Sequence, residues 1–326
     1  NQTAASTYSG RFAGTGTVIK TGASNFTWSG HDAANGFTGT FSVAQGLVIL
    51  NGAGSQLNGA SDIVLSGSGS SLRFDNDQTT AVGSRITDIA TITLSSTAGT
   101  TADSLGFYMR RSAGTTTGTE TVGQLVLNTG HNTVAAEGNA TDRIARINFV
   151  NAVPLVRNNL STLLLVARNF AATAGQRGRI SFSVAPSGAI GGGGAAGTST
   201  LNIYPYMVGE DASGAPSGAA NFGNTFVYYE TGTTDMRPLN LTTEYVVDEA
   251  NFNLLGAGVL ANNVRFTASP GAALDSDTTG VNALVLDNAT GITIGGAAQP
   301  LQITSGAILS AGAGANVING FTKIGR

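Results

Sequence analysis

The feature that most constrains this chain is the alternation of short β-type runs with corners built from Gly, Asn and Ser. It is clearest in residues 15–50, where runs such as 17–20 and 47–50 are separated by small and polar corner residues. Runs this short that end in turn formers favour strands over helices. Repeated units of strand and corner are typical of stacked, solenoidal sheets. The pattern therefore predicts an architecture and identifies no reaction.

The same rhythm continues along the chain. Three similar units follow one another within residues 291–318: Gly-Ile-Thr-Ile-Gly-Gly, Leu-Gln-Ile-Thr-Ser-Gly and Ala-Ile-Leu-Ser-Ala-Gly. A β-sandwich prefers longer strands and distinct hairpin turns, whereas stacked turns of chain need only short strands and permissive corners. We therefore expect an all-β, parallel β-helix (a β-solenoid) that spans residues 1–326 as a single elongated domain. The Gly-rich segments 187–198 and 209–224 are expected to be loops inserted into it.

Residues 159–170 allow two interpretations. Their apolar spacing and Asn/Ser start are compatible with a short helix. A fully buried strand is favoured, because Pro154 precedes the segment and Gly175 follows it.

Composition excludes several classes of protein. Charged residues make up 11% of the chain, against roughly 25% in an ordinary soluble domain. The net charge of -3 gives no basic field for a phosphate backbone, so no nucleic-acid partner is expected. Cysteine is absent, which removes disulfides, thiolate metal sites and cysteine nucleophiles. No apolar run approaches the ~20 residues of a membrane span, so the chain is not expected to be membrane-embedded.

Several motifs resemble a known family. Residues 16–22, followed by Trp-Ser-Gly at 28–30, Phe-Thr-Gly at 37–39 and Ala-Gln-Gly-Leu at 44–47, resemble the repeat unit of bacterial autotransporter-associated β-strand repeat proteins. Residues 120–134, 237–239 and 263–267 also resemble segments found in this order in family members. Trp28 departs from the pattern, which usually has a small aliphatic residue there. The resemblance implies a secreted, right-handed β-helix that serves as a stalk or scaffold.

The two ends of the chain carry related sequences. Residues 320–325, Gly-Phe-Thr-Lys-Ile-Gly, look like a new start of the unit at 16–22. Solenoids normally cap their ends, because an open turn exposes unpaired backbone groups and apolar edges. We expect no such cap here, and therefore predict that copies of the chain associate end to end. The residues predicted to take part are Gly16, Val18, Lys20, Phe321, Lys323 and Ile324.

Two Asp-Xaa-Asp pairs are candidates for chemistry. Asp75 with Asp77, and Asp275 with Asp277, place two carboxylates on one face of a strand. Glycoside hydrolysis needs two carboxylates that face a cleft, and calcium takes oxygen ligands of this kind. Solvated turn residues are the favoured interpretation, so no cofactor is predicted, and calcium is the one metal that these four residues could hold.

These observations together favour a non-enzymatic, extracellular or bacterial cell-surface protein that forms a fibre, layer or matrix by association of copies. One alternative is an adhesin passenger that displays a binding loop, residues 209–224, to a surface glycan or protein. A third hypothesis is a β-helical enzyme that acts on polysaccharide through Asp75 and Asp77.

Overall fold

The computed structural model describes residues 3–30, 36–52, 54–75, 84–98, 105–111, 117–138, 143–170, 175–212, 216, 223–247, 260–270, 280–296 and 300–325. These residues form strands joined by turns, with no α-helix among them, so the all-β prediction is confirmed. It follows that no helix in this part of the chain could span a membrane.

The chain divides into two compact units. The first comprises Asn1–Ser187, Glu210–Asn221 and Thr231–Met236. The second comprises Gly188–Gly209, Phe222–Glu230 and Arg237–Arg326.

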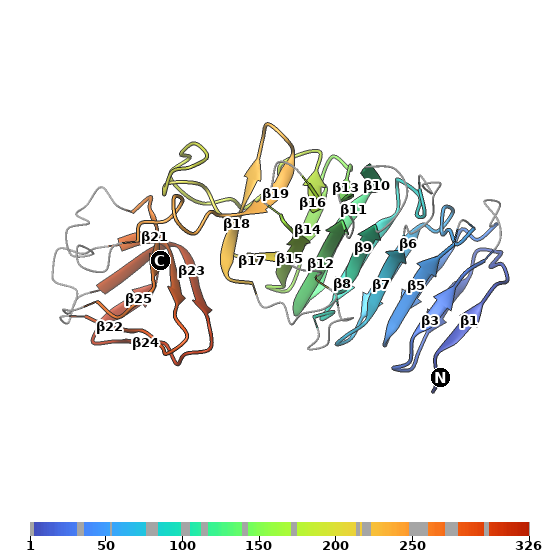
Figure 1. Ribbon diagram of the computed structural model, residues 1–326, viewed down its shortest axis with the longest axis horizontal. Coiled ribbons are helices and arrows are strands. Elements are labelled where there is room, and N and C mark those ends of the chain that lie inside the picture. Colours follow the sequence, from blue (N-terminus) through green and yellow to red (C-terminus); the bar gives the residue numbers. More distant parts are fainter. Residues whose placement is uncertain are drawn as a thin grey trace. The chain divides into compact units, whose positions relative to one another are not determined.

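Two sets of parallel strands dominate the first unit, and the chain alternates between them (Figure 1). One set consists, in order, of β1 (Ser6–Tyr8), β3 (Phe26–Trp28), β5 (Leu47–Asn51), β7 (Ser71–Asp75), β9 (Phe107–Arg111), β12 (His131–Gly138) and β15 (Thr162–Arg168). The other consists, from its last strand to its first, of β14 (Leu155–Arg157), β11 (Gln124–Thr129), β8 (Thr91–Ser95), β6 (Asp62–Ser66), β4 (Thr40–Val43) and β2 (Thr17–Lys20).

The strand register stacks apolar residues on apolar residues. Val48 pairs with Leu72, Leu72 with Phe107 and Phe107 with Val134, and all four side chains are fully buried. The other set has an equivalent row of Phe41, Ile63, Ile92 and Leu125. Every second residue of a strand points to the same face, so the alternation seen in the sequence becomes the core of this unit.

A third group of strands makes the main sheet mixed. Strands β10 (Thr117–Val122), β13 (Ile144–Phe149) and β16 (Arg177–Phe182) pair in parallel, but β19 (Asp235–Pro238) pairs antiparallel with β16. Strands β17 (Met207–Ala212) and β18 (Thr225–Glu230) are also antiparallel. The resulting 13-stranded sheet runs from β1 to β10 and is not closed.

The predicted right-handed parallel β-helix is therefore wrong for this chain. The mixed, open 13-stranded sheet overturns it. Short alternating strands specify which face is buried, but parallel and antiparallel ladders use the same backbone donors and acceptors. The periodicity of the sequence could not distinguish them.

The more local predictions had different outcomes. Residues 162–168 form the buried strand β15, as the favoured interpretation of 159–170 required. Residues 187–198 contain no strand and are joined to the rest of their unit by an Ile190–Ile203 bridge. The loop predicted at 209–224 is wrong for residues 209–212, which belong to β17, and most of its remainder lies outside the described residues.

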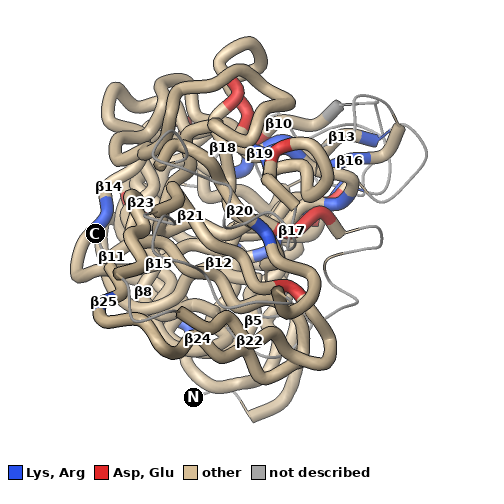
Figure 2. Tube along the Cα trace, turned by 90° about the vertical axis from the view of Figure 1, so that its left-hand side faces the viewer, with Lys and Arg blue, Asp and Glu red and all other residues tan. Residues whose placement is uncertain are grey.

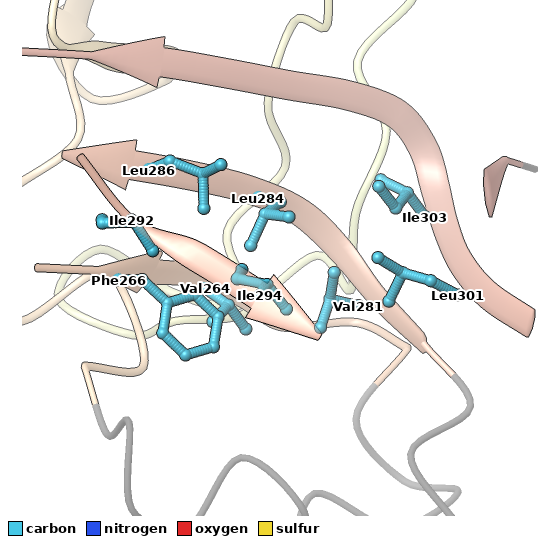
Figure 3. Close-up of a cluster of buried hydrophobic side chains, with 9 residues drawn as sticks. All are labelled: Val264, Phe266, Val281, Leu284, Leu286, Ile292, Ile294, Leu301 and Ile303. Atoms are coloured by element: carbon cyan, nitrogen blue, oxygen red, sulfur yellow. The ribbon is translucent and has the colours of Figure 1, made fainter. Parts of the chain in front are cut away.

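The second unit has its own parallel strands and core. Strands β20 (Asn263–Phe266), β21 (Gly280–Asp287), β23 (Pro300–Ala311) and β25 (Lys323–Gly325) form one sheet, and β22 (Thr293–Gly295) pairs with β24 (Val317–Asn319). Figure 3 shows how side chains of β20, β21, β22 and β23 meet in one buried cluster. Its members are Val264, Phe266, Val281, Leu284, Leu286, Ile292, Ile294, Leu301 and Ile303.

The close approach of neighbouring strands generates a prediction at Gly39. A Cβ added there would overlap the carbonyl oxygen of Gly16, whereas a Cβ at Gly36 would have no atom within 4 Å. Gly39→Ala should therefore lower the free energy of unfolding by about 1–3 kcal/mol. Gly36→Ala should change it by less than about 0.5 kcal/mol. Urea titration of both variants tests this, and equal effects would contradict the packing described.

Candidate functional site: the terminal strand edges

The first edge is formed by β1 and β2, the terminal strands of their sheets. In β2, Val18 pairs with Phe41 and so lies on the core-facing side, while Ile19 points outward and is 60% exposed. Gly16 lies in the exposed bend that leads into β2. Of the residues predicted to associate, Gly16 and Val18 thus do lie at an edge.

Aromatic side chains cover part of the core at this edge. The ring of Phe12, between β1 and β2, lies 4.9 Å from Trp28 in an edge-to-face contact and 5.2 Å from Tyr8. The indole Nε1 of Trp28 donates a hydrogen bond to the carbonyl of Gly10 at 2.9 Å. The sequence predicted no cap here. Phe12 was missed because it stands in a Gly-rich segment outside any periodic run.

A cavity of about 440 Å³ opens beside these aromatic residues. Its lining is mixed: Phe12, Val18, Ile19, Phe26 and Phe41 are apolar, and Ser6, Lys20 and Thr21 are polar. Ser6 pairs with Phe26, and Phe26 with Val48, so a small residue occupies the last position of a row of large ones. The hollow thus lies where the core of this unit meets its terminal strands.

Lys20 is directed into its own unit. It occupies the core-facing position that Val43 and Leu65 take in the next strands, and it is only 8% exposed. Its Nζ donates to the carbonyls of Ser24 at 2.7 Å and Gln45 at 2.9 Å, and also to that of Gly22. Burial lowers the pKa of its ammonium group. Lys20 therefore holds a corner together and does not present its charge to another molecule.

The second edge belongs to the last strands of the second unit. Strand β25 pairs with Pro300–Gln302 of β23, which leaves Ala307–Ala311 with no described partner strand on the side away from β21. Strand β24 is terminal as well. Three large apolar side chains are exposed here at 42–44%: Ile308, Val317 and Ile324. Phe321 packs partly against the core, and Lys323 is exposed.

The four aspartates are not brought together as a site. Asp75 is 2% exposed and pairs with Arg73 at 2.9 Å and with Arg110 at 2.8 Å. Two guanidinium groups thus pair with the Asp75 carboxylate, which the sequence analysis named as a candidate for binding calcium or for catalysis. Asp77, Asp275 and Asp277 lie outside the described residues. Within the described ranges, no three His, Cys, Asp or Glu side chains could together hold a metal.

A buried contact between Glu120 and the backbone at Arg85 and Ile86 was not predicted. Glu120 accepts hydrogen bonds from the backbone N–H groups of Arg85 at 3.0 Å and Ile86 at 2.7 Å. The guanidinium of Arg85 donates to Gly52, Ser55 and the carbonyl of Asp75. Both residues are fully buried, and burial raises the pKa of Glu120 to about 8 although the N–H donors lower it. The carboxyl group orders the chain at Arg85 and Ile86.

Charged side chains are sparse along the chain (Figure 2). Most of those described in the first unit serve internal contacts such as these. The geometry therefore singles out two apolar strand edges.

Comparison with known proteins finds no match to any family model, curated protein or solved structure.

The two edge lysines should differ in their effect on stability. Lys20→Met leaves three corner carbonyls without their donor and should cost about 1–3 kcal/mol of unfolding free energy. Lys323→Met removes an exposed charge and should cost less than about 0.5 kcal/mol. Denaturant unfolding at low protein concentration measures both. If Lys20→Met left the free energy of unfolding unchanged, the ammonium group would not stabilise the corner.

The raised pKa of Glu120 predicts a pH dependence. Between the unfolded pKa near 4.5 and the folded pKa of about 8, the folded chain binds more protons than the unfolded chain. Stability should therefore fall as pH rises through this window, by at most ~1.4 kcal/mol per pH unit from this group. Glu120→Gln, which cannot ionise, should flatten the curve of melting temperature against pH. Parallel curves for the two proteins would show that Glu120 does not titrate in this way.

Proposed function

We propose that this protein is a non-enzymatic structural component of an extracellular or bacterial cell-surface fibre, layer or matrix, and that it assembles by association of like copies. The observation that carries the proposal is the pair of apolar strand edges, β1 with β2 and β23 to β25, at which sheets of the two units end. An open strand edge can accept a strand from another chain by main-chain hydrogen bonding.

Two further features support the proposal. A chain with 11% charged residues has little like-charge repulsion to keep copies apart. The resemblance of residues 16–47 to autotransporter-associated β-strand repeats favours a secreted scaffold. The two edges differ from each other, so a contact between unlike edges leaves one edge of each kind open, and assembly can continue.

Sedimentation velocity and electron microscopy over a range of concentrations test the proposal. Species larger than the 32.7 kDa chain should appear, and their share should rise with concentration. Because the contact is expected to be apolar and main-chain in character, added salt should not dissolve them. Particles that stay single at the highest attainable concentration would refute the proposal.

A further inference from the structure

The exposed apolar residues of the second unit gather at its last strands. Among the described residues of this unit, four large apolar side chains are exposed, and Ile308, Val317 and Ile324 are three of them. Each belongs to a different strand, β23, β24 or β25. Beside Ile308, the stretch Ala307–Ala311 pairs with β21, and no described strand pairs with it on its other side. This combination of apolar side chains and an open ladder is what another strand would cover.

We propose that this surface receives the first two strands of a second copy, with β1 lying along Ala307–Ala311 of β23 and β2 lying along β24. The inference rests on the proposed function, and it specifies which strands meet and in which register. Residue 308 would lie opposite Ser6, and residue 318 opposite Val18.

The core-facing positions of the two edges match in this register. Ile308 pairs with Leu284 and Ile318 pairs with Ile294, and both partners belong to the buried cluster of the second unit. Ser6 and Val18 hold the equivalent positions in the first unit, because Ser6 pairs with Phe26 and Val18 pairs with Phe41 in its apolar rows. One register therefore extends both apolar rows at once. A shift by one residue would turn them outward.

The spacing along the chain is also compatible. Ile308 and Ile318 are ten residues apart, and Ser6 and Val18 are twelve residues apart. Within the second unit, Leu284 and Ile294 are likewise ten residues apart. Each edge thus offers two strands joined by a connection of similar length.

The sizes of the side chains are complementary. Ser6 is small and lines the cavity of about 440 Å³, whereas Ile308 is large and 44% exposed. An isoleucine placed opposite Ser6 can fill part of that hollow, and burial of its aliphatic side chain would stabilise the contact.

Charge does not oppose the contact. Residues 300–319 contain no charged side chain, and residues 3–19 contain only Arg11. Lys20 directs its ammonium into its own corner, and Lys323 lies on β25, outside the proposed contact. A second copy of the chain is therefore the occupant that both edges fit.

Disulfide trapping tests the register, because the chain has no native cysteine. Ile19 and Asn319 are both exposed and would lie side by side, at the ~4.8 Å spacing of neighbouring strands, which a disulfide can span. Mild oxidation of the double variant Ile19→Cys/Asn319→Cys should give a ladder of covalent oligomers. Each single variant should give no species beyond a dimer.

A control double variant measures how much cross-linking arises from chance collisions between copies. The variant Ile89→Cys/Asn319→Cys replaces residue 19 with a more exposed position, 83% for Ile89, that lies outside the terminal strands. It should give no ladder above background. Far-UV circular dichroism of every variant should match that of the parent chain, so that misfolding cannot imitate the result.

A charge placed in the contact gives an independent measurement. Ile308→Glu should weaken association at least tenfold in sedimentation equilibrium, because a carboxylate would replace an apolar side chain that the contact buries. Val184→Glu is the control, since Val184 is similarly exposed, at 48%, but lies away from the terminal strands. It should leave the affinity unchanged.

The outcomes separate this inference from the function on which it rests. A ladder from the Ile19→Cys/Asn319→Cys variant, with loss of affinity in Ile308→Glu, supports both. If copies associate but neither effect appears, the register is wrong and the proposed function stands. If the parent chain stays monomeric at every concentration, both are refuted.

Discussion

Parallel pairing in register places each core side chain against its counterpart in the neighbouring strand, and most of this structure depends on that stacking. Val48, Leu72, Phe107 and Val134 form one such row, and Val264, Leu284 and Ile308 form another in the second unit. Full burial of one such side chain stabilises by about 1.5–3 kcal/mol, so a few rows suffice to hold short strands together. The same stacking brings backbones so close that Gly39 has no room for a side chain.

Short strands need many corners, and the corners determine how the few charged residues are used. Lys20 and Arg157 stand at opposite ends of one core-facing row, in β2 and β14, and each donates to carbonyls of its own corner. Arg85 and Glu120 satisfy backbone groups inside the first unit in the same way. A buried carbonyl without a donor costs roughly 1–3 kcal/mol, which explains why charges stand at positions otherwise held by Val or Leu.

Sheets that do not close must end somewhere, and here their ends are only partly protected. Phe12 covers the core beside β1 and β2, while β23, β24 and β25 expose one apolar residue each. Monomeric proteins usually blunt such edges with charges, bulges or covering loops. The stability of a single chain therefore does not explain why these edges are apolar. The proposed assembly explains it, because a second copy would cover them.

The alternation of apolar and polar residues was by itself enough to determine the all-β class, the short strands with small corner residues, and the burial of residues 162–168. It also placed Val18 and Ile324 at terminal strands, because these lie in short runs near the two ends. Only the tertiary structure decided the direction of each strand, the division into two units, the inward turn of Lys20 and the pairing of Asp75 with two arginines. The physical reason is that periodicity records which face of a strand is buried. The choice of partner depends on contacts between residues far apart in the chain, and parallel and antiparallel ladders satisfy the same backbone groups.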